Sequence, residues 1–371
     1  MRTNASRSYK ILVISDYRDV NSSRPEAEIF IQLAAEGNLV SILSYPGASY
    51  YNDRFRSFGI EVIEEHPSKK AHLPDIRFLR TLIRKKKFDF VHAFNSYGLT
   101  NAIWSMIGLP SKLIAYRGYA GQTYWYDPLM YVKYFHPRVD HIICLSDDIR
   151  NILSHHMPWG KSKLTTIHKG HDPEWYHVIE KIDRASLGFT AQDILITCVA
   201  NVRPFKGIPY LIQSTYELPF ESQIHLLLIG NGYDVGTVKI LIDNSPFKDK
   251  IHILGFRKNS MSIVASSDAT VLSSTHGEAL TKSVIESMCL GVPPIITDIP
   301  GNDGLVNDGE SGWVIAPKNS SALTNALIEA ASSKKERERR GKNASLHIEK
   351  NFHTRETVKK FLLLYEALLS K

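Results

Sequence analysis

Two glutamates in the second half of the chain have a type and spacing that could serve one binding cleft. Glu278 follows Gly277 in a polar turn, and Glu286 lies eight residues later in a stretch with helical periodicity expected to begin near Leu280. Eight residues of helix amount to about 12 Å of rise and about 80° of rotation. Both carboxylates could therefore reach the same cleft at different depths. Two solvated glutamates on an amphipathic helix fit the same spacing.

The expected start of that helix also offers a place for an anion. The backbone amides of Ala279, Leu280 and Thr281 would lie in its first turn, where amides have no partner within the helix. Together with the helix dipole they give the N-terminus about half a positive charge. A pyrophosphate is a ligand that such a terminus binds well.

Arg203 and Lys206 form a second candidate anion site. They follow an apolar strand expected over Asp193–Ala200 and precede a helix expected over Ile208–Tyr216. A guanidinium and an ammonium in a loop of this kind can hold a diphosphate. A solvated pair of loop residues is the alternative.

These groups need a scaffold, and the pattern of short apolar strands and helical stretches predicts an α/β fold. Further strands are expected over Lys10–Ser15, Asn38–Leu43, Asp89–Phe94, Lys112–Tyr116, Asp140–Ser146, Thr165–Ile167, Ile224–Ile229 and Ala269–Leu272. Further helices are expected over Pro25–Ala35, Asp75–Phe88, Ala322–Ala331 and Thr357–Leu369. The 371 residues exceed what one core usually serves, so we expect two domains.

His92 and Arg117 stand near the ends of expected strands, where open α/β sheets place their ligands. A histidine satisfied within the core and an arginine in a structural ion pair are the alternatives. The stretch Tyr119–Pro137 is rich in aromatic residues, which stack on sugar rings, enter membrane interfaces or simply pack between helices.

The formal charge of +7 favours anionic partners, and nucleotides, phospholipid and nucleic acid all qualify. In the expected helix Asp75–Phe88, Arg77, Arg80 and Arg84 lie opposite the apolar side chains. They form either a solvated face or a surface that docks on an anionic membrane.

Three cysteines without C-x-x-C spacing favour a reducing compartment and no structural metal. The first residues lack the features of a signal peptide, and no run of about eighteen apolar residues occurs. We therefore expect a cytoplasmic location, with any contact at the inner membrane peripheral.

The segment Ser273–Asp298, SSTHGEALTKSVIESMCLGVPPIITD, resembles the E-x7-E signature of the retaining family 4 glycosyltransferases of the GT-B fold. The resemblance implies two Rossmann-like, doubly wound domains facing across a cleft. An acceptor-binding domain would span residues 1–178 and a nucleotide-sugar-binding domain residues 179–350. A terminal helix, residues 351–371, would cross back to the first domain.

The resemblance also implies roles for residues of the second domain. Glu278 would contact the donor sugar, Glu286 the ribose, and Lys206 the diphosphate. The family's arginine usually precedes this lysine by five residues, where Asn201 stands here, so Arg203 takes the role only if the loop bends. Gly230 would flank the nucleotide, and the segment ending at Phe256 would meet the base.

In the first domain, His92 matches the first histidine of a frequent H-A-H in the family, and Arg117 stands where a histidine commonly touches the donor sugar. Gly304 is a further departure, because the family has a glutamate there.

The implied activity is retaining transfer of a sugar from a nucleotide-diphosphate donor to a glycan or lipid-linked acceptor, in surface polysaccharide or lipopolysaccharide synthesis. No D-x-D motif is present, so a metal-independent reaction without a further cofactor is expected. An epimerase or phosphorylase of the same fold is one alternative. A degenerate nucleotide-sugar-binding module is another, since Asn201, Arg117 and Gly304 depart from the family. Nucleic-acid binding would explain the basic charge but not the E-x7-E segment.

Overall fold

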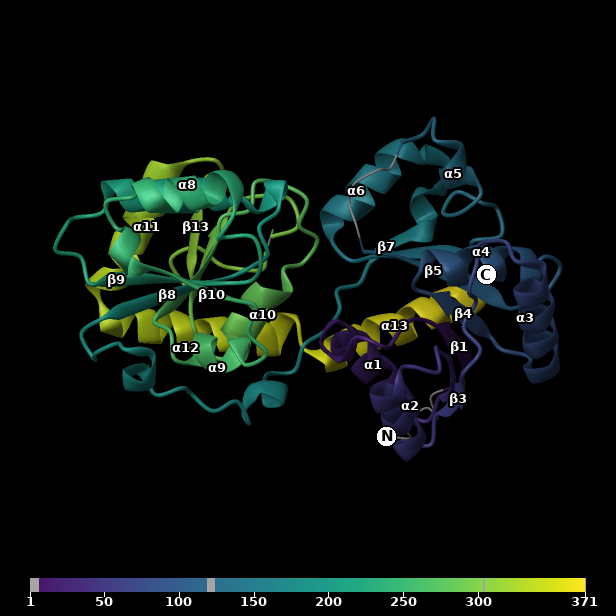
Figure 1. Ribbon diagram of the computed structural model, residues 1–371. Helices are drawn as coiled ribbons and strands as arrows, with labels where there is room; N and C mark the ends of the chain where they lie inside the picture. Colours follow the sequence, from purple (N-terminus) through teal and green to yellow (C-terminus); the bar gives the residue numbers. More distant parts are fainter. Residues whose placement is uncertain (1–6, 119–123, 303, 371) are drawn as a thin grey trace. The chain divides into compact units, whose positions relative to one another are not determined.

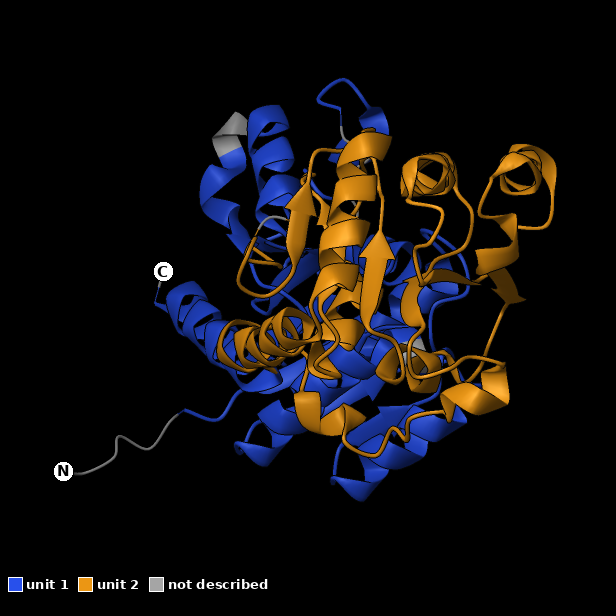
Figure 2. Cartoon of the chain, turned by 90° about the vertical axis from the view of Figure 1, so that its left-hand side faces the viewer, with its two compact units in different colours: residues 1–170, 354–371 blue, residues 171–353 orange. Residues whose placement is uncertain are grey.

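The computed structural model describes residues 7–118, 124–302 and 304–370, and the chain divides into two compact units (Figures 1 and 2). Unit 1 comprises residues 1–170 and 354–371, and unit 2 comprises residues 171–353. The chain thus passes between the units at 170–171 and 353–354, whereas the sequence placed these divisions at 178–179 and 350–351. Both units are α/β, as predicted.

Unit 1 is built on a parallel sheet of seven strands in the order β3-β2-β1-β4-β5-β6-β7. The strands are β1 (Lys10–Ile14), β2 (Leu39–Leu43), β3 (Glu61–Ile63), β4 (Phe90–Ala93), β5 (Lys112–Arg117), β6 (His141–Cys144) and β7 (Leu164–Thr166). The order runs outward in both directions from β1 and β4, which is the doubly wound arrangement. Short apolar strands form this sheet because helices cover both of its faces.

The helices of unit 1 are α1 (Val20–Ala35), α2 (Ser49–Ser57), α3 (Leu73–Lys86), α4 (Ser96–Ser105), α5 (Pro128–Tyr131), α6 (Asp147–His156) and α13 (Thr354–Leu369), with the 3-10 helix η1 (Pro158–Lys163). Helix α1 begins five residues earlier than the sequence suggested. The amide of Ser23 already bonds to the carbonyl of Asp19, at 3.1 Å, so the first turn forms upstream of Pro25. A proline in the second turn forfeits only one helical hydrogen bond.

The terminal helix α13 packs in unit 1, beside α1 (Figure 1). The ring of Phe361 lies against that of Phe30, with centroids 6.1 Å apart, and Tyr365 stacks on Phe90 of β4 at 4.2 Å. All four side chains are fully buried or nearly so. The last helix therefore completes the core of the unit that contains the first strand.

Unit 2 has a parallel sheet of six strands in the order β10-β9-β8-β11-β12-β13. The strands are β8 (Ile194–Val199), β9 (Ile224–Ile229), β10 (Ile251–Gly255), β11 (Ala269–Leu272), β12 (Pro294–Thr297) and β13 (Trp313–Ile315). The helices are α7 (Ile208–Ser214), α8 (Gly236–Asn244), α9 (Ser260–Ala265), α10 (Lys282–Cys289), α11 (Ser320–Ser332) and α12 (Lys334–Asn351). The 3-10 helices are η2 (Pro173–Tyr176), η3 (Arg184–Leu187), η4 (Pro204–Lys206), η5 (Thr215–Glu217) and η6 (Lys248–Lys250).

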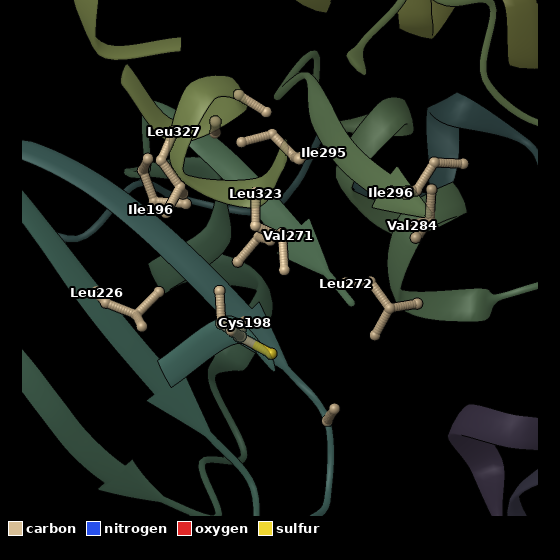
Figure 3. Packing of buried hydrophobic residues seen from close by; sticks show 14 of the residues in the cluster. Ile196, Cys198, Leu226, Val271, Leu272, Val284, Ile295, Ile296, Leu323 and Leu327 are labelled. Carbon is tan, nitrogen blue, oxygen red and sulfur yellow. The ribbon is translucent and has the colours of Figure 1, made fainter. Parts of the chain in front are cut away.

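Counted from β8, this order is 3-2-1-4-5-6, the order of a dinucleotide-binding Rossmann sheet. Its core is apolar (Figure 3): Ile196, Val271 and Ile295 from three adjacent strands cluster with Leu323 and Leu327 of α11. From β8 the strand order runs outward to β9 and β10 on one side, and from β11 to β12 and β13 on the other, so the order reverses between β8 and β11. Ligands of such sheets bind at this switch point, outside the carboxyl ends of the strands.

Candidate functional site

The two loops that follow β8 and β11 meet at the switch point of unit 2, and they carry the main predicted site residues. Residues 200–207 follow β8 and contain Lys206, and residues 273–281 follow β11 and contain Glu278. Adjacent parallel strands end at the same edge of the sheet, so two segments 72 residues apart in sequence come together there.

The ammonium of Lys206 and the carboxylate of Glu278 form an ion pair. Lys206 Nζ donates to Glu278 Oε1 over 2.6 Å, and Ser274 Oγ donates to the same oxygen over 2.6 Å. The side chains of Lys206 and Glu278 are only 15% and 10% exposed. Charge-assisted hydrogen bonds of this length are strong, and low exposure strengthens them further. The site therefore places one cation and one carboxylate at a single point.

Hydrogen bonds between the two loops hold this pair in place. Ser273 Oγ lies 3.1 Å from the carbonyl oxygens of both Lys206 and Gly207, and the amide of Thr275 donates to the carbonyl of Phe205 over 2.7 Å. Gly207 has a φ of +63°, and a Cβ there would lie 2.0 Å from the carbonyl oxygen of Ser273. Only glycine allows the loops to approach this closely.

A third loop, after β12, fixes the backbone around Glu278 from its other side. Gly301 has a φ of +93°, and a Cβ there would stand 2.0 Å from the carbonyl oxygen of Glu278. The hydroxyl of Thr281 donates to Asn302 Oδ1 over 3.1 Å. The residues just before α10 are thus held by contacts outside the helix.

This arrangement corrects the predicted start of the helix. Helix α10 begins at Lys282, and Thr281 precedes it with extended backbone angles, because its hydroxyl is engaged by Asn302. The amides of Ala279, Leu280 and Thr281 therefore lie before the first turn and not in it. Glu278 stands outside the helix, so the separation of the two glutamates does not follow helical geometry.

Glu286 lies inside α10 and is 8% exposed. Its Oε1 pairs with Lys282, one turn earlier, and lies 3.5 Å from the hydroxyl of Tyr176 in η2. The carboxylate is thus held by groups on both sides. Tyr176 was not predicted as a site residue, because no motif marks it and it lies 110 residues before Glu286.

Asn201 and Arg203, both in the loop after β8, differ in their contacts. Asn201 accepts a hydrogen bond from the amide of Asn231 over 2.9 Å, and the amide of Val202 donates to the carbonyl of Asn231 at the same distance. Asn201 therefore joins the loops after β8 and β9. Arg203 is exposed, at the start of η4.

Gly230 and Phe256 lie at the carboxyl ends of the next two strands. The amide of Gly230 donates to the carbonyl of Gly255 over 2.9 Å, and Phe256 follows with its ring 69% exposed. The structure thus brings the predicted residues of unit 2 to one edge of one sheet.

In unit 1, His92 is a core residue, which corrects its prediction as a substrate contact. It is 1% exposed, its Nε2 lies 2.8 Å from the hydroxyl of Tyr365, and its ring stacks on Phe361. Burial lowers the pKa of His92 to about 3, because a charged imidazole would lose its hydration. Its neighbours on α13 leave no open side for a sugar.

Arg117 ends β5, and its guanidinium lies over the ring of Tyr134, 4.9 Å from the centroid. Within the predicted aromatic stretch, residues 119–123 lie outside the described residues. The remainder exposes several large side chains around α5. These are Tyr124, Trp125, Tyr126, Leu129, Tyr131 and Val132.

The basic helix α3 uses one of its three arginines internally. Arg80 donates to the carbonyls of Ser105 and Ile107, over 2.9 and 2.8 Å, at the end of α4, whereas Arg77 and Arg84 are exposed. Among the described residues, no helix combines the length and the apolar character needed to cross a bilayer.

Two family models match the chain in succession. Residues 27–175 match "Glycosyltransferase Family 4", and residues 179–347 match "Glycosyl transferases group 1". The second match contains Lys206 and Glu278, which pair at the edge of the unit 2 sheet, and Glu286 of α10.

Relatives and solved structures agree with these matches. The chain is 24% identical, over 80% of its length and 80% of theirs, to an Escherichia coli UDP-Gal:alpha-D-GlcNAc-diphosphoundecaprenol alpha-1,3-galactosyltransferase. A glycosyltransferase structure from Rickettsia africae superposes with a TM-score of 0.81 at 18% identity, covering 98% of this chain and 99% of that one. Anabaena HepE, solved in complex with UDP, superposes with a TM-score of 0.77 at 16% identity, covering 96% and 100%. The chain therefore belongs to the family 4 glycosyltransferases and has their GT-B fold.

Proposed function

We propose that this glycosyltransferase is a retaining, metal-independent enzyme that moves a sugar from a nucleotide-diphosphate donor to a glycan or lipid-linked acceptor. The observation that carries the proposal is the Lys206–Glu278 ion pair at the switch point of unit 2. It supplies a cation for the departing diphosphate and a carboxylate for the sugar hydroxyls at one place. Surface polysaccharide or lipopolysaccharide assembly is the proposed setting.

Lys206 would exchange Glu278 for a phosphate oxygen when the donor binds. Its Nζ already lies where the loops after β8 and β11 meet. An ammonium directed at a leaving diphosphate stabilises the negative charge that develops on it. Glu278 would keep the hydrogen bond from Ser274 and turn its free oxygen toward the sugar. Arg203, exposed on the same loop, would add a second cation once the loop bends toward the phosphates.

In this reaction the bond between the anomeric carbon and the diphosphate breaks, and a bond from the acceptor oxygen to the same face of that carbon forms. The acceptor's proton passes to the departing diphosphate. The protein's residues orient and stabilise these groups, and none attacks the sugar. Lys206 lowers the energy of the charged leaving group, which is the largest charge that the reaction creates.

The nucleotide would lie along the carboxyl edge of the unit 2 sheet. Glu286 would accept the ribose hydroxyls, while Gly230 and Phe256 would flank the nucleotide and its base. We propose a uridine base, because the solved complex of Anabaena HepE contains UDP and the E. coli relative is named for UDP-Gal.

The charge of unit 1 supports an anionic acceptor. Unit 1 contains 27 lysines and arginines against 17 acidic residues, a net charge of +10, whereas unit 2 contains 18 against 21, a net charge of −3. The acceptor in the name of the E. coli relative is a diphosphoundecaprenol carrying GlcNAc. A lipid diphosphate of this class carries the negative charge that unit 1 would attract.

Such an acceptor lies in a membrane, and unit 1 has surface groups suited to peripheral docking there. Exposed Arg84 and Lys85 on α3 would bind anionic lipids, at about 1 kcal/mol each, and the exposed aromatic side chains around α5 suit an interface. Arg84→Glu with Lys85→Glu should reduce binding to phosphatidylglycerol vesicles by about tenfold or more. Lys239→Glu, on unit 2, is the matched control. Unchanged vesicle binding of the double variant would refute docking through α3.

Thermal unfolding against UDP, GDP and ADP tests the donor site. A ligand at about 100 times its Kd stabilises the native protein by about 2.7 kcal/mol, so binding raises the melting temperature measurably. We expect a shift with UDP, lost in Lys206→Ala and kept in Lys239→Ala. A UDP shift without transfer from any UDP-sugar would favour the degenerate binding module. Epimerised donor or free sugar phosphate without acceptor would favour the epimerase or phosphorylase.

A further inference from the structure

Three side chains that can bind a metal gather where the chain enters and leaves unit 2. Asp172 is the second residue of this unit, and Glu349 and His353 lie at its end. One donor atom from each lies within 4.8 Å of the others. Within the described ranges, this is the only group of three or more histidine, cysteine and acidic residues with such spacing.

The two distances from His353 to the carboxylates suit a small tetrahedral ion. His353 Nε2 lies 3.4 Å from Asp172 Oδ1 and 3.6 Å from Glu349 Oε2. Zinc binds nitrogen and oxygen at about 2.0–2.2 Å, so the ligand atoms of a tetrahedral site lie about 3.3–3.6 Å apart. The side chains of Asp172, Glu349 and His353 are 24%, 39% and 12% exposed, which leaves a path for an ion and a water.

Local structure holds the ligands in place before any ion binds. Asp172 caps η2, with its Oδ1 accepting the amide of Glu174 over 2.9 Å. Glu349 lies in the last turn of α12, four residues before His353. The amide of His171 donates to the carbonyl of Phe352 over 2.8 Å, so the two connecting segments are already joined beside the cluster. Ligands fixed in this way lose little conformational freedom on binding.

We propose that Asp172, Glu349 and His353 form a binding site for a divalent transition-metal ion, with zinc as the ion that best fits one imidazole and two carboxylates. Water completes the coordination. The ion fastens the entering and leaving segments of the chain to each other. It takes no part in the glycosyl transfer, so the site stands independently of the proposed reaction.

The site also adjoins the proposed nucleotide site through η2. The turn capped by Asp172 carries Tyr176, whose hydroxyl lies 3.5 Å from Glu286 Oε1. An ion bound to Asp172 therefore steadies the turn that supports the carboxylate assigned to the ribose.

The first experiment measures zinc bound to the full chain after treatment with EDTA, in a preparation without a polyhistidine tag. Equilibrium dialysis against ZnCl2 should give one zinc per chain. His353→Gln and Glu349→Gln should each weaken this binding by at least about tenfold, as loss of even a supporting group does at metal sites. His347→Gln removes another histidine of α12, half-buried and bonded to the carbonyl of Gly304, and should leave the binding unchanged.

A second variant separates a metal site from a simple ion pair between a protonated His353 and the two carboxylates. His353→Arg supplies a permanent cation for the carboxylates but no metal ligand. We expect zinc to raise the melting temperature of the wild type and of His347→Gln, and to leave those of His353→Arg and His353→Gln unchanged. Zinc should also slow amide hydrogen exchange in residues 171–174 and 349–353 of the wild type.

Two results would overturn the proposal. Wild-type protein that binds no more zinc than His353→Arg would show that the cluster is only an ion pair. One zinc per chain retained by both His353→Gln and Glu349→Gln would place the ion elsewhere.

Discussion

Replacing Lys206 by alanine tests the central ion pair of unit 2. The change removes the ammonium that lies 2.6 Å from Glu278 Oε1. The Glu278 side chain, which is 10% exposed, then keeps only the hydrogen bond from the hydroxyl of Ser274 among these two partners. Removing one partner of a buried pair costs about 3–5 kcal/mol, because the other charge stays unpaired. We expect a somewhat smaller loss of unfolding free energy here, since both side chains keep some exposure to water.

The effect on turnover should be comparable in free energy to the effect on stability. Loss of one group that stabilises a developing anion lowers kcat by about 10² to 10³, or about 2.7–4 kcal/mol. UDP release is the assay, with the donor sugar chosen from a panel of UDP-sugars and supplied at saturation. Lys239→Ala is the matched control, because this lysine is exposed on α8 and pairs only locally with Asp243.

A double-mutant cycle separates stability from chemistry. Lys206→Ala with Glu278→Gln removes the unpaired charge, so the double variant should regain part of the lost unfolding free energy. It should not regain turnover, because the diphosphate still lacks its cation. The reasoning is refuted if Lys206→Ala releases UDP within about threefold of the wild-type rate, or if the double variant recovers activity together with stability.

Three further changes have defined outcomes. Arg203→Ala should raise the donor KM severalfold and leave the melting temperature within about 1 °C, because the guanidinium is exposed in the protein without donor. If the variant is as stable as the wild type and its donor KM is unchanged, Arg203 does not bind the donor. Gly207→Ala should cost at least about 1–3 kcal/mol in urea unfolding, because its φ of +63° and the carbonyl of Ser273 at 2.0 Å leave no space for a methyl group. Burial holds the pKa of His92 near 3, below its usual 6.5, so the unfolded chain binds the extra proton between these pH values and stability falls as the pH falls from about 6.5 to 3. The slope contributed by His92 is at most about 1.4 kcal/mol per pH unit, and urea titrations should show it reduced in His92→Asn but not in His347→Gln, which changes a half-buried histidine of unit 2.

Much of the scaffold could be predicted from the sequence because it depends on local patterns. Apolar runs marked nine strands with ends within two residues of those observed, and Ile224–Ile229 and Ala269–Leu272 were predicted with the bounds they have. The strands β3, β10, β12 and β13 were not predicted. The strands β3 and β13 are only three residues long. The strand β12 lies inside the segment Ser273–Asp298, which was interpreted by its glutamates and not by its apolar run.

The errors at individual residues arose from contacts distant in sequence. The start of α10 was misplaced because Thr281 bonds to Asn302, 21 residues later, a contact that helical periodicity does not reveal. His92 was taken for a substrate contact because it is near a strand end. Its partner Tyr365 lies 273 residues later, on a helix that covers this face of the sheet. Strand periodicity shows that a side chain points to one face but not what covers that face.

The Lys206–Glu278 pair also explains how the site stays folded before a donor binds. An isolated ammonium or carboxylate with so little exposure would cost several kcal/mol, and the pair offsets much of that cost. A diphosphate brings more negative charge than one carboxylate, so Lys206 gains by turning to it. Glu278 would keep the hydrogen bond from Ser274 and would become free to accept the sugar hydroxyls. Donor binding would thus create the group that orients the sugar, and Lys206→Ala should affect donor affinity and turnover together.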